Sequence, residues 1–398
     1  MRDNKKSVSD LAIFGGLPLF NEPLHVGRPN IGNRNLLNKR FNEILDNIWL
    51  SNNGPFVQKL ERNIEKYLGV KHCIAVCNAT IGLEITIKAM NLTGEVIVPS
   101  FTFIATAHAL KWQEINPVFC DIDPKTHNID PEKIENLITP HTSGIIGVHV
   151  WGRPCAIEAL VDIATKHHLK LMFDAAHAFG GSYHGSMIGN FGDAEVFSFH
   201  ATKFFNTFEG GAVVTNDDDL AVKIRLMKNF GFSGYDNVIH IGTNGKMNEF
   251  SAAMGLTGLE NIQQFIRTNY ENYNNYKTNL CEIPGIQLIK YNETEQCNYQ
   301  YIVLEVNEKF INISRDRILE ILQKENILAR RYFFPGCHNM EPYKSLNPDA
   351  GKQLPETEKL MKKVLILPTG TSMNEKSVKC VCELIGFIIN NAREITKK

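Results

Sequence analysis

Several features that would assign the sequence to particular classes of protein are missing. The 398 residues carry a formal net charge of −1, so no excess of positive charge favours nucleic acid or an anionic membrane surface. No run of about 18 apolar residues occurs, which argues against a membrane-spanning helix, and the first residues do not form a cleavable signal pattern. We therefore expect a cytoplasmic protein with neither a membrane nor a nucleic acid as its partner.

The cysteines do not have the spacing expected of a disulfide framework or of a metal site. Nine cysteines are scattered along the chain, and no two of them form a CxxC pair. This odd set favours reduced thiols over a disulfide framework, and no metal site is expected. The motifs GxxxxGK[ST] and strand-coupled GxGxxG are missing too, so neither of these nucleotide-binding signatures competes with the interpretation below.

The residues that are present predict a large folded protein. Hydrophobic residues make up 43% of the chain and charged residues 21%, which is ample material for a core, and the length suits one large domain with a smaller one. We expect an N-terminal arm over residues 1–35, a large domain over 36–265 and a small domain over 266–398. Short apolar runs alternate with amphipathic segments from residue 72, which predicts a parallel sheet wrapped by helices. The expected strands are residues 73–77, 95–98, 117–121, 144–150, 170–173, 194–199 and 211–215.

Two chemically useful residues follow neighbouring apolar runs of this sheet. Asp174 ends the run 169–173, and Lys203 comes just after the run 194–199. Ligands of open α/β sheets collect at the carboxyl ends of strands, so one place would receive both a carboxylate and an amine. This pair suits pyridoxal phosphate, because a lysine forms its Schiff base and an aspartate keeps its pyridine nitrogen protonated. A solvated or ion-paired role is the alternative for either residue.

Residues with phosphate-binding capacity follow two other expected strands. Asn78, Ala79 and Thr80 open a helix, where free N–H groups and the Thr80 hydroxyl could hold a phosphate. An ordinary helix cap would have the same sequence. Ser198, in the strand that leads to Lys203, offers a further hydroxyl.

Aromatic residues and a histidine stand near the same strand ends. Phe101 and Phe103 could stack on a pyridine ring, or could simply belong to the core. His177, three residues after Asp174, could bond the phenolic oxygen of the cofactor or be a structural histidine.

The order of these signals, with the segments CNATIGLE, VPSFTFIATAHAL, FDAAHAFGG and FSFHATK, resembles the DegT-type sugar nucleotide aminotransferases, a branch of the fold-type I pyridoxal-phosphate enzymes. The likeness runs from LSNNGPFVQKLE at Leu50 to the pair Leu367-Pro368. It implies an α/β fold with a mostly parallel central sheet flanked by helices and a smaller C-terminal α+β domain. It also implies that Lys203 is the Schiff-base lysine and Asp174 the pyridinium partner. The implied cofactor neighbours are Ala79, Thr80, Phe103, His177 and Ser198.

The resemblance further implies a homodimer with shared active sites, in which Asn244 reaches the cofactor phosphate of the second subunit. The family usually has Arg where this sequence has Lys246. This difference bears on the substrate pocket rather than on the cofactor site.

Transamination is favoured over dehydration, because relatives that dehydrate a ketodeoxysugar have His at the lysine position or add iron–sulfur cysteines. The resemblance implies L-glutamate as the donor and ping-pong kinetics. The implied acceptor is a nucleotide-linked ketosugar, above all C4 of dTDP-4-keto-6-deoxy-D-glucose, giving dTDP-4-amino-4,6-dideoxy-D-glucose for O-antigen or other surface polysaccharide. The expected residues of the substrate side are Asn52, Arg330, Arg331 and His338.

Four alternatives stay open from the sequence. Two of them change the acceptor, to a C3 ketosugar or to a GDP-linked 4-keto sugar as in perosamine synthesis. The third is a regulator that binds the cofactor without turnover, which the intact Lys203, Asp174 and Ser198 argue against. The fourth is a fold-type I lyase, which would cleave an amino acid.

Overall fold

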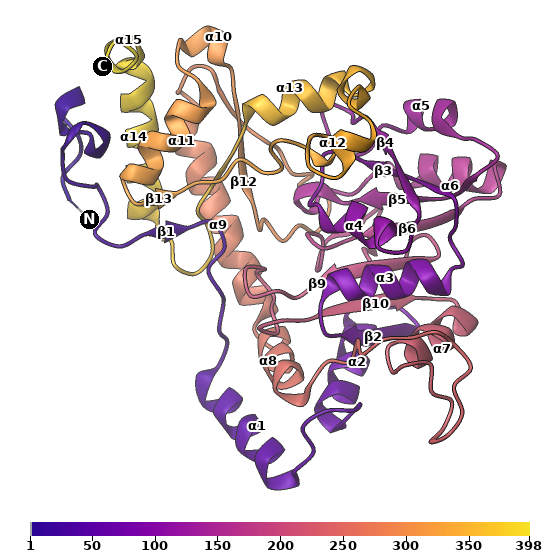
Figure 1. Cartoon of the computed structure of the whole chain (residues 1–398). Helices are drawn as coiled ribbons and strands as arrows, with labels where there is room; N and C mark the ends of the chain where they lie inside the picture. The colour runs from indigo at the N-terminus through magenta and orange to yellow at the C-terminus, as the bar shows by residue number, and fades with distance from the viewer. Residues whose placement is uncertain (1) are drawn as a thin grey trace.

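A seven-stranded sheet forms the centre of the protein in the computed structural model, which describes residues 2–398 (Figure 1). Its strand order is β2-β10-β9-β6-β5-β3-β4, and only β10 runs antiparallel to its neighbours. The carboxyl ends of the other strands therefore meet at one edge of the sheet. The strands are β2 (His72–Val76), β3 (Glu95–Pro99), β4 (Asn116–Cys120), β5 (Thr142–Val148), β6 (Lys170–Asp174), β9 (Ala194–Ser198) and β10 (Gly211–Thr215).

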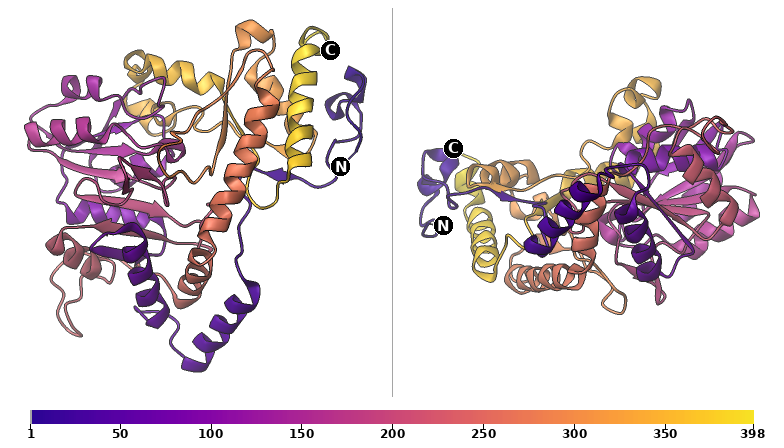
Figure 2. Two further views of the ribbon diagram at one scale, coloured as in Figure 1. Left: turned by 180° about the vertical axis from the view of Figure 1, so that it is seen from behind. Right: turned by 90° about the horizontal axis from the view of Figure 1, so that it is seen from below.

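Helices cover both faces of this sheet, as the views in Figure 2 show. One face carries α3 (Ala79–Ala89), α4 (Ala105–Lys111) and α7 (Asp218–Met227), and the other carries α2 (Pro55–Leu68), α6 (Ile157–Lys166) and α8 (Glu249–Leu259). Each helix turns an apolar side inward, so that Ile224 of α7 and Leu256 of α8 are fully buried on opposite faces. Asn248 caps α8 by accepting a 2.8 Å hydrogen bond from the Ser251 amide, as its position in the sequence predicts.

Smaller elements complete this part of the chain. α1 (Arg34–Asn47) projects from the body and contacts α8 (Figure 1). The others are α5 (Pro131–Ile134) and the hairpin of β7 (Ser182–Tyr183) and β8 (Ser186–Met187).

The C-terminal part of the chain forms a smaller α+β unit around an antiparallel sheet. Its strands are β11 (Ile286–Leu288), β12 (Ile302–Val306) and β14 (Val364–Leu367). The long helix α9 connects the two units (Figure 1). The helices of this part are α9 (Ile262–Leu280), α10 (Glu308–Ile311), α11 (Arg315–Lys324), α12 (Tyr343–Leu346), α13 (Pro355–Lys363), α14 (Glu375–Asn390) and α15 (Ala392–Ile395).

The N-terminal segment packs on this smaller unit instead of extending as a free arm. Leu11 and Leu19 are fully buried in the core of the C-terminal part. β1 (Leu24–His25) also pairs in parallel with β13 (Ile327–Leu328). The domain boundaries after residues 35 and 265 stay a prediction.

The predicted α/β architecture is confirmed, and all seven strands of the central sheet lie within a few residues of their expected positions. β12 begins only at Ile302, since the preceding Asn298 and Gln300 turn their side-chain amides toward the loops after β6 and β9. Across residues 2–398, no helix combines the length and the apolar character needed to cross a bilayer.

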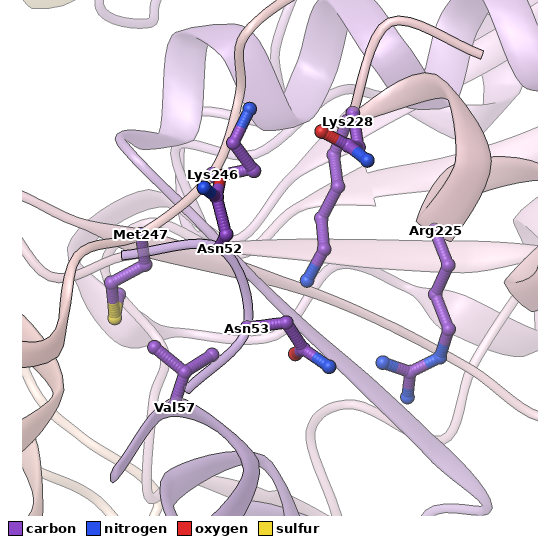
Figure 3. A pocket seen from close by; sticks show the side chains of 8 residues that line it. Asn52, Asn53, Val57, Arg225, Lys228, Lys246 and Met247 are labelled. Atoms are coloured by element: carbon purple, nitrogen blue, oxygen red, sulfur yellow. The ribbon is translucent and has the colours of Figure 1, made fainter. Parts of the chain in front are cut away.

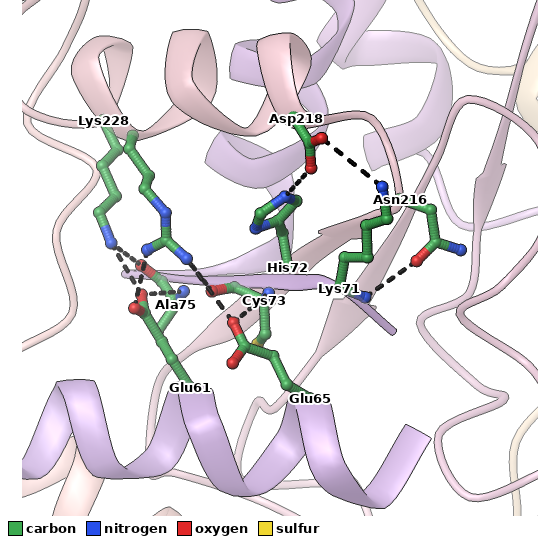
Figure 4. A network of polar contacts seen from close by, with 10 residues as sticks. Glu61, Glu65, Lys71, His72, Cys73, Ala75, Asn216, Asp218 and Lys228 are labelled. Carbon is green, nitrogen blue, oxygen red and sulfur yellow. Dashed lines mark hydrogen bonds and ion pairs between the residues drawn. The ribbon is translucent and has the colours of Figure 1, made fainter. Parts of the chain in front are cut away.

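Charged side chains cover the free edge of β2 (Figure 4). Glu61 of α2 accepts from the Ala75 amide at 2.8 Å and forms ion pairs with Lys228 at 3.0 Å and Arg225 at 2.8 Å. The same two cations donate to the carbonyl oxygens of Ala75 and Cys73. Because an uncovered edge strand exposes unpaired N–H and C=O groups, this network closes the sheet where the chain provides no further strand.

Replacing Glu61 with alanine is expected to lower the free energy of unfolding by about 3–5 kcal/mol, because buried Lys228 would lose its carboxylate partner. Burial raises the pKa of the Glu61 carboxyl, but Lys228 and Arg225 outweigh it, so the pKa lies below the ordinary 4.5. The stabilisation is therefore present above pH 4.5 and is lost as the pH falls through the lowered pKa. Denaturant titration at pH 7 and at acidic pH measures both effects.

Glu271→Ala serves as the matched control, since it removes an exposed carboxylate paired with exposed Arg267. This change should cost no more than about 1 kcal/mol. Equal losses in the two variants would contradict the assigned role of Glu61.

Candidate active site

Asp174 ends β6 with its carboxylate fixed by two hydrogen bonds. The Thr106 hydroxyl of α4 donates to Oδ2 at 2.7 Å, and the Ala176 amide donates to Oδ1 at 3.1 Å. Burial raises the pKa of this carboxyl, although these bonds and the positive charge of Lys203 oppose the shift. Asp174 is thus a buried carboxylate with a fixed orientation.

Lys203 stands in the loop that follows β9, the strand next to β6 in the sheet. Burial lowers the pKa of its amine to about 8, while the charge of Asp174 raises it. Since each of these two groups shifts the pKa of the other, the structure brings them within electrostatic range, as the sequence predicts. A lysine with this pKa has a substantial neutral fraction near neutral pH, which a nucleophilic amine requires.

His177 lies beside Lys203 in the turn after β6. Its Nδ1 accepts from the Trp151 amide at 3.3 Å, and its ring centre lies 4.6 Å from that of Tyr301 and 5.9 Å from that of Phe333. Burial and the charge of Lys203 hold its pKa well below the usual range. His177 is therefore a neutral imidazole whose Nε2 carries the proton and can donate a hydrogen bond.

Two of the predicted phosphate-binding residues, Ala79 and Ser198, lie next to Gly211. This glycine is opposite Ser198 of β9, and a Cβ atom on it would lie 2.9 Å from the Ala79 nitrogen. The Asn78 side chain accepts only the Ile81 amide of the first turn of α3, so the amides of Ala79 and Thr80 point away from the helix. The close packing at Gly211 brings β10 against the start of α3, whose free amides are donors of the kind that a phosphate needs.

The two phenylalanines before α4 have different environments. Phe101 is fully buried and packs edge-on against Trp151 and Phe333, so it belongs to the core. Phe103 is 60% exposed, and its carbonyl oxygen accepts from the Thr106 amide at 3.2 Å. Phe103 is therefore the aromatic ring that is free to cover a ligand next to Asp174.

The predicted substrate residues do not gather in one place. His338 is 2% exposed, with Nδ1 2.6 Å from the Ser100 hydroxyl and Nε2 2.9 Å from Glu358. Because both of its ring nitrogens already have partners, His338 has no free nitrogen with which to bind a substrate. Arg331 pairs with Asp316 at 2.9 Å, whereas Arg330 is exposed.

Asn52 lines a separate cavity of about 200 Å³ beside the edge of β2 (Figure 3). Arg225, Lys228 and Lys246 line this cavity, with the first two paired to Glu61, and none of the predicted cofactor residues lines it. Asn244 is exposed in the loop that leads to Lys246, where a second subunit could meet it. Within one subunit, Asn52 and Asn244 are therefore not part of the site around Lys203.

Several residues that shape the site have no clear signal in the sequence. Thr106 is one helical residue among many, and Trp151 meets His177 both through its backbone amide and by stacking of its ring, with the ring centres 6.2 Å apart. Asn298 donates to the His177 carbonyl at 2.8 Å, and Gln300 accepts from the Phe204 amide at 3.0 Å. The sequence gives one indication of the last two residues. The polar run NYQY (residues 298–301) precedes an apolar strand, and amide side chains that become buried there need hydrogen-bond partners.

Comparisons with known proteins agree with this geometry. The chain is 38% identical over 378 residues to dTDP-4-amino-4,6-dideoxy-D-glucose transaminase of Shigella dysenteriae, an alignment that covers 94% of this chain and 99% of that protein. It is 34% identical over 352 residues to GDP-perosamine synthase of Caulobacter vibrioides, covering 87% and 94% of the two chains.

Among solved structures, DesI in the presence of its TDP-sugar product superposes with a TM-score of 0.93 at 46% identity, covering 98% of this chain and 99% of that one. The predicted fold and the predicted resemblance are thus confirmed. Residues 33–386 match the model of one family, and the chain belongs to it: the DegT/DnrJ/EryC1/StrS aminotransferase family.

Proposed function

We propose that this protein transfers the amino group of L-glutamate to C4 of dTDP-4-keto-6-deoxy-D-glucose, with pyridoxal phosphate as its cofactor. The observation that carries the proposal is the pairing of buried Asp174 with Lys203, an amine of lowered pKa, at adjoining strand ends. The choice of acceptor is supported by the two dTDP-4-amino-4,6-dideoxy-D-glucose transaminases, from Shigella dysenteriae and Escherichia coli, that are each 38% identical to the chain.

The residues of the site have the donors and charges that this cofactor needs. Ser198, Thr80 and the amides that open α3 would hold the phosphate, and Phe103 would cover the ring. Asp174 would face the pyridine nitrogen, and the proton on His177 Nε2 would meet the phenolic oxygen. When bound, the cofactor supplies an electron sink for the carbanion that forms at the substrate carbon.

The chain itself supplies binding, orientation and proton transfer. The carboxylate of Asp174, fixed by Thr106, places a negative charge where the ring nitrogen must stay protonated. Lys203 would hold the cofactor through its amine, and the same amine, when free, would move the proton at the reacting carbon. Its pKa of about 8 suits both tasks, because the amine can take up and release a proton near neutral pH.

A second subunit would complete the site. Large apolar side chains are exposed at the end of α1 and in the loop after α7, where Ile48 is 83%, Tyr235 100% and Ile241 80% exposed. Such patches usually mark interaction surfaces, and Asn244 lies in the same loop. We propose a homodimer whose interface buries these two segments, with Asn244 contributing to the partner's phosphate site.

If the protein is a dimer, the mass measured by sedimentation should depend on the protein concentration. Ile48→Asp combined with Ile241→Asp should shift the protein toward the monomer, because each change places a charge in the buried interface. The control Leu346→Asp alters an apolar side chain that is 60% exposed elsewhere and should leave the dimer intact. A wild-type protein that sediments as a monomer would contradict the proposal.

The acceptor is tested by product analysis. Purified protein with glutamate is offered dTDP- and GDP-linked sugars with the ketone at C3 or C4, and the products are identified by mass and by nuclear magnetic resonance. The proposal requires that the dTDP-linked 4-keto sugar be aminated fastest. A preference for the GDP-linked 4-keto sugar would support the second candidate, which rests on the similarity to GDP-perosamine synthase.

A further inference from the structure

Tyr301, just before β12, brings a phenol hydroxyl to the amine of Lys203. Lys203 Nζ donates to the Tyr301 Oη at 3.4 Å, and the tyrosine is only 7% exposed. Its ring packs 4.6 Å from His177 and 5.4 Å from Trp151, measured between ring centres. The Tyr291 hydroxyl also donates to the Tyr301 carbonyl oxygen at 2.8 Å, so both ends of the tyrosine are fixed.

The residue before Tyr301 fixes the lysine loop as well. The Gln300 side chain accepts from the amide of Phe204, the residue that follows Lys203, at 3.0 Å. One short segment of the smaller unit therefore sets both the phenol and the loop that carries the amine. The distance between the Tyr301 hydroxyl and the Lys203 amine therefore depends on this segment as well as on the central sheet.

The other polar groups near the Lys203 amine form hydrogen bonds with other partners. Both carboxylate oxygens of Asp174 already accept hydrogen bonds, and His177 is neutral with Nδ1 engaged by a backbone amide. Burial raises the pKa of Tyr332, which is therefore a neutral phenol, and in the described part of the chain it forms no hydrogen bond with Lys203. Among residues 2–398, Tyr301 is the only side chain that accepts a hydrogen bond from Lys203 Nζ.

We propose that Tyr301 is a further catalytic residue, whose hydroxyl accepts a hydrogen bond from the Lys203 ammonium while that group holds the proton taken from the substrate. The inference rests on the proposed aminotransferase function. In the step concerned, the carbon–hydrogen bond of the substrate breaks, its electron pair stays on the substrate, and its proton joins the lone pair of Nζ. Within the same half of the transfer, the ammonium would then release this proton to the carbon of the bound cofactor that takes over the amino group, which restores the neutral amine of Lys203.

The environment of the pair explains why this contact matters. Burial lowers the pKa of Lys203, so the ammonium needs a compensating acceptor to hold a proton at all. Burial also raises the pKa of Tyr301, so the phenol stays neutral and keeps its dipole for this task. Hydrogen bonds from a charged donor are the stronger kind, and their loss favours the neutral amine.

The variant Tyr301→Phe tests the inference without requiring turnover. In the full-length protein freed of cofactor, acylation of Lys203 is followed by peptide mass analysis across a pH series. We expect half-maximal acylation to move to lower pH by about one pH unit, a tenfold change in proton affinity. In the complete enzyme, kcat should fall about tenfold while KM stays within about twofold.

Tyr299→Phe is the matched control, since it removes a buried phenol from the same segment at a place that touches other tyrosines and not Lys203. An unchanged acylation midpoint in Tyr301→Phe, or the same shift in Tyr299→Phe, would overturn the inference. Because acylation needs no substrate, a protein that shows the shift but aminates no ketosugar would count against the proposed function alone.

Discussion

Replacing Lys203 with alanine is expected to abolish amino transfer, with kcat reduced by about 10⁴-fold or more. The variant loses the amine that binds the cofactor and also the group that moves the proton, and no second lysine belongs to the described site. Turnover with glutamate and the ketosugar measures the loss, and the visible absorbance of the purified protein reports whether cofactor is still attached.

Lys170→Ala is the control for this result. Lys170 starts β6 at the end opposite Asp174 and forms an exposed ion pair with Asp193 at 3.2 Å. Surface pairs of this kind contribute little, so activity should match that of the wild type. Turnover above about one hundredth of the wild-type rate in Lys203→Ala would refute the role assigned to Lys203.

Replacing Asp174 with asparagine is expected to lower kcat by about 10³-fold while leaving the protein folded. The amide keeps the size of the side chain but removes the charge that holds a proton on the pyridine nitrogen. Since Thr106 and Ala176 both donate to the carboxylate, one of them would also face an NH₂ group, which weakens the orientation. Steady-state kinetics together with the absorbance of the bound cofactor, followed against pH, measures the effect.

Asp218→Asn provides the comparison for Asp174→Asn. Asp218 is an exposed aspartate that pairs with His72 and Lys71 at the start of α7, just past the end of β10 that is opposite Gly211. Its substitution should leave both kcat and the cofactor spectrum unchanged. Wild-type turnover in Asp174→Asn would remove the carboxylate from the mechanism.

The central sheet was predictable because its strands are short apolar runs, buried on both faces, that alternate with amphipathic helices. Asp174 and Lys203 were predictable for a related reason, since strand ends in such sheets deliver their side chains to a common edge. The cap formed by Asn248 also follows from local sequence alone.

Other features depend on contacts between distant segments. The reversed direction of β10 follows from its pairing with β2 and β9, which no periodicity records. His338 resembles a substrate residue in the sequence, yet it is buried by Ser100 and Glu358, which lie 238 and 20 residues away along the chain. Tyr301 reaches Lys203 only because the smaller unit folds against the sheet.

Borohydride reduction of the purified protein, followed by peptide mass mapping, tests the central claim most directly. Reduction makes a lysine–cofactor bond permanent, so the mass of the reduced pyridoxyl phosphate group should appear on the peptide that contains Lys203. That mass should disappear when the protein is first converted by excess glutamate, because the amine is then free. A label on another lysine, or no label on a protein that carries out the transfer, would contradict the account.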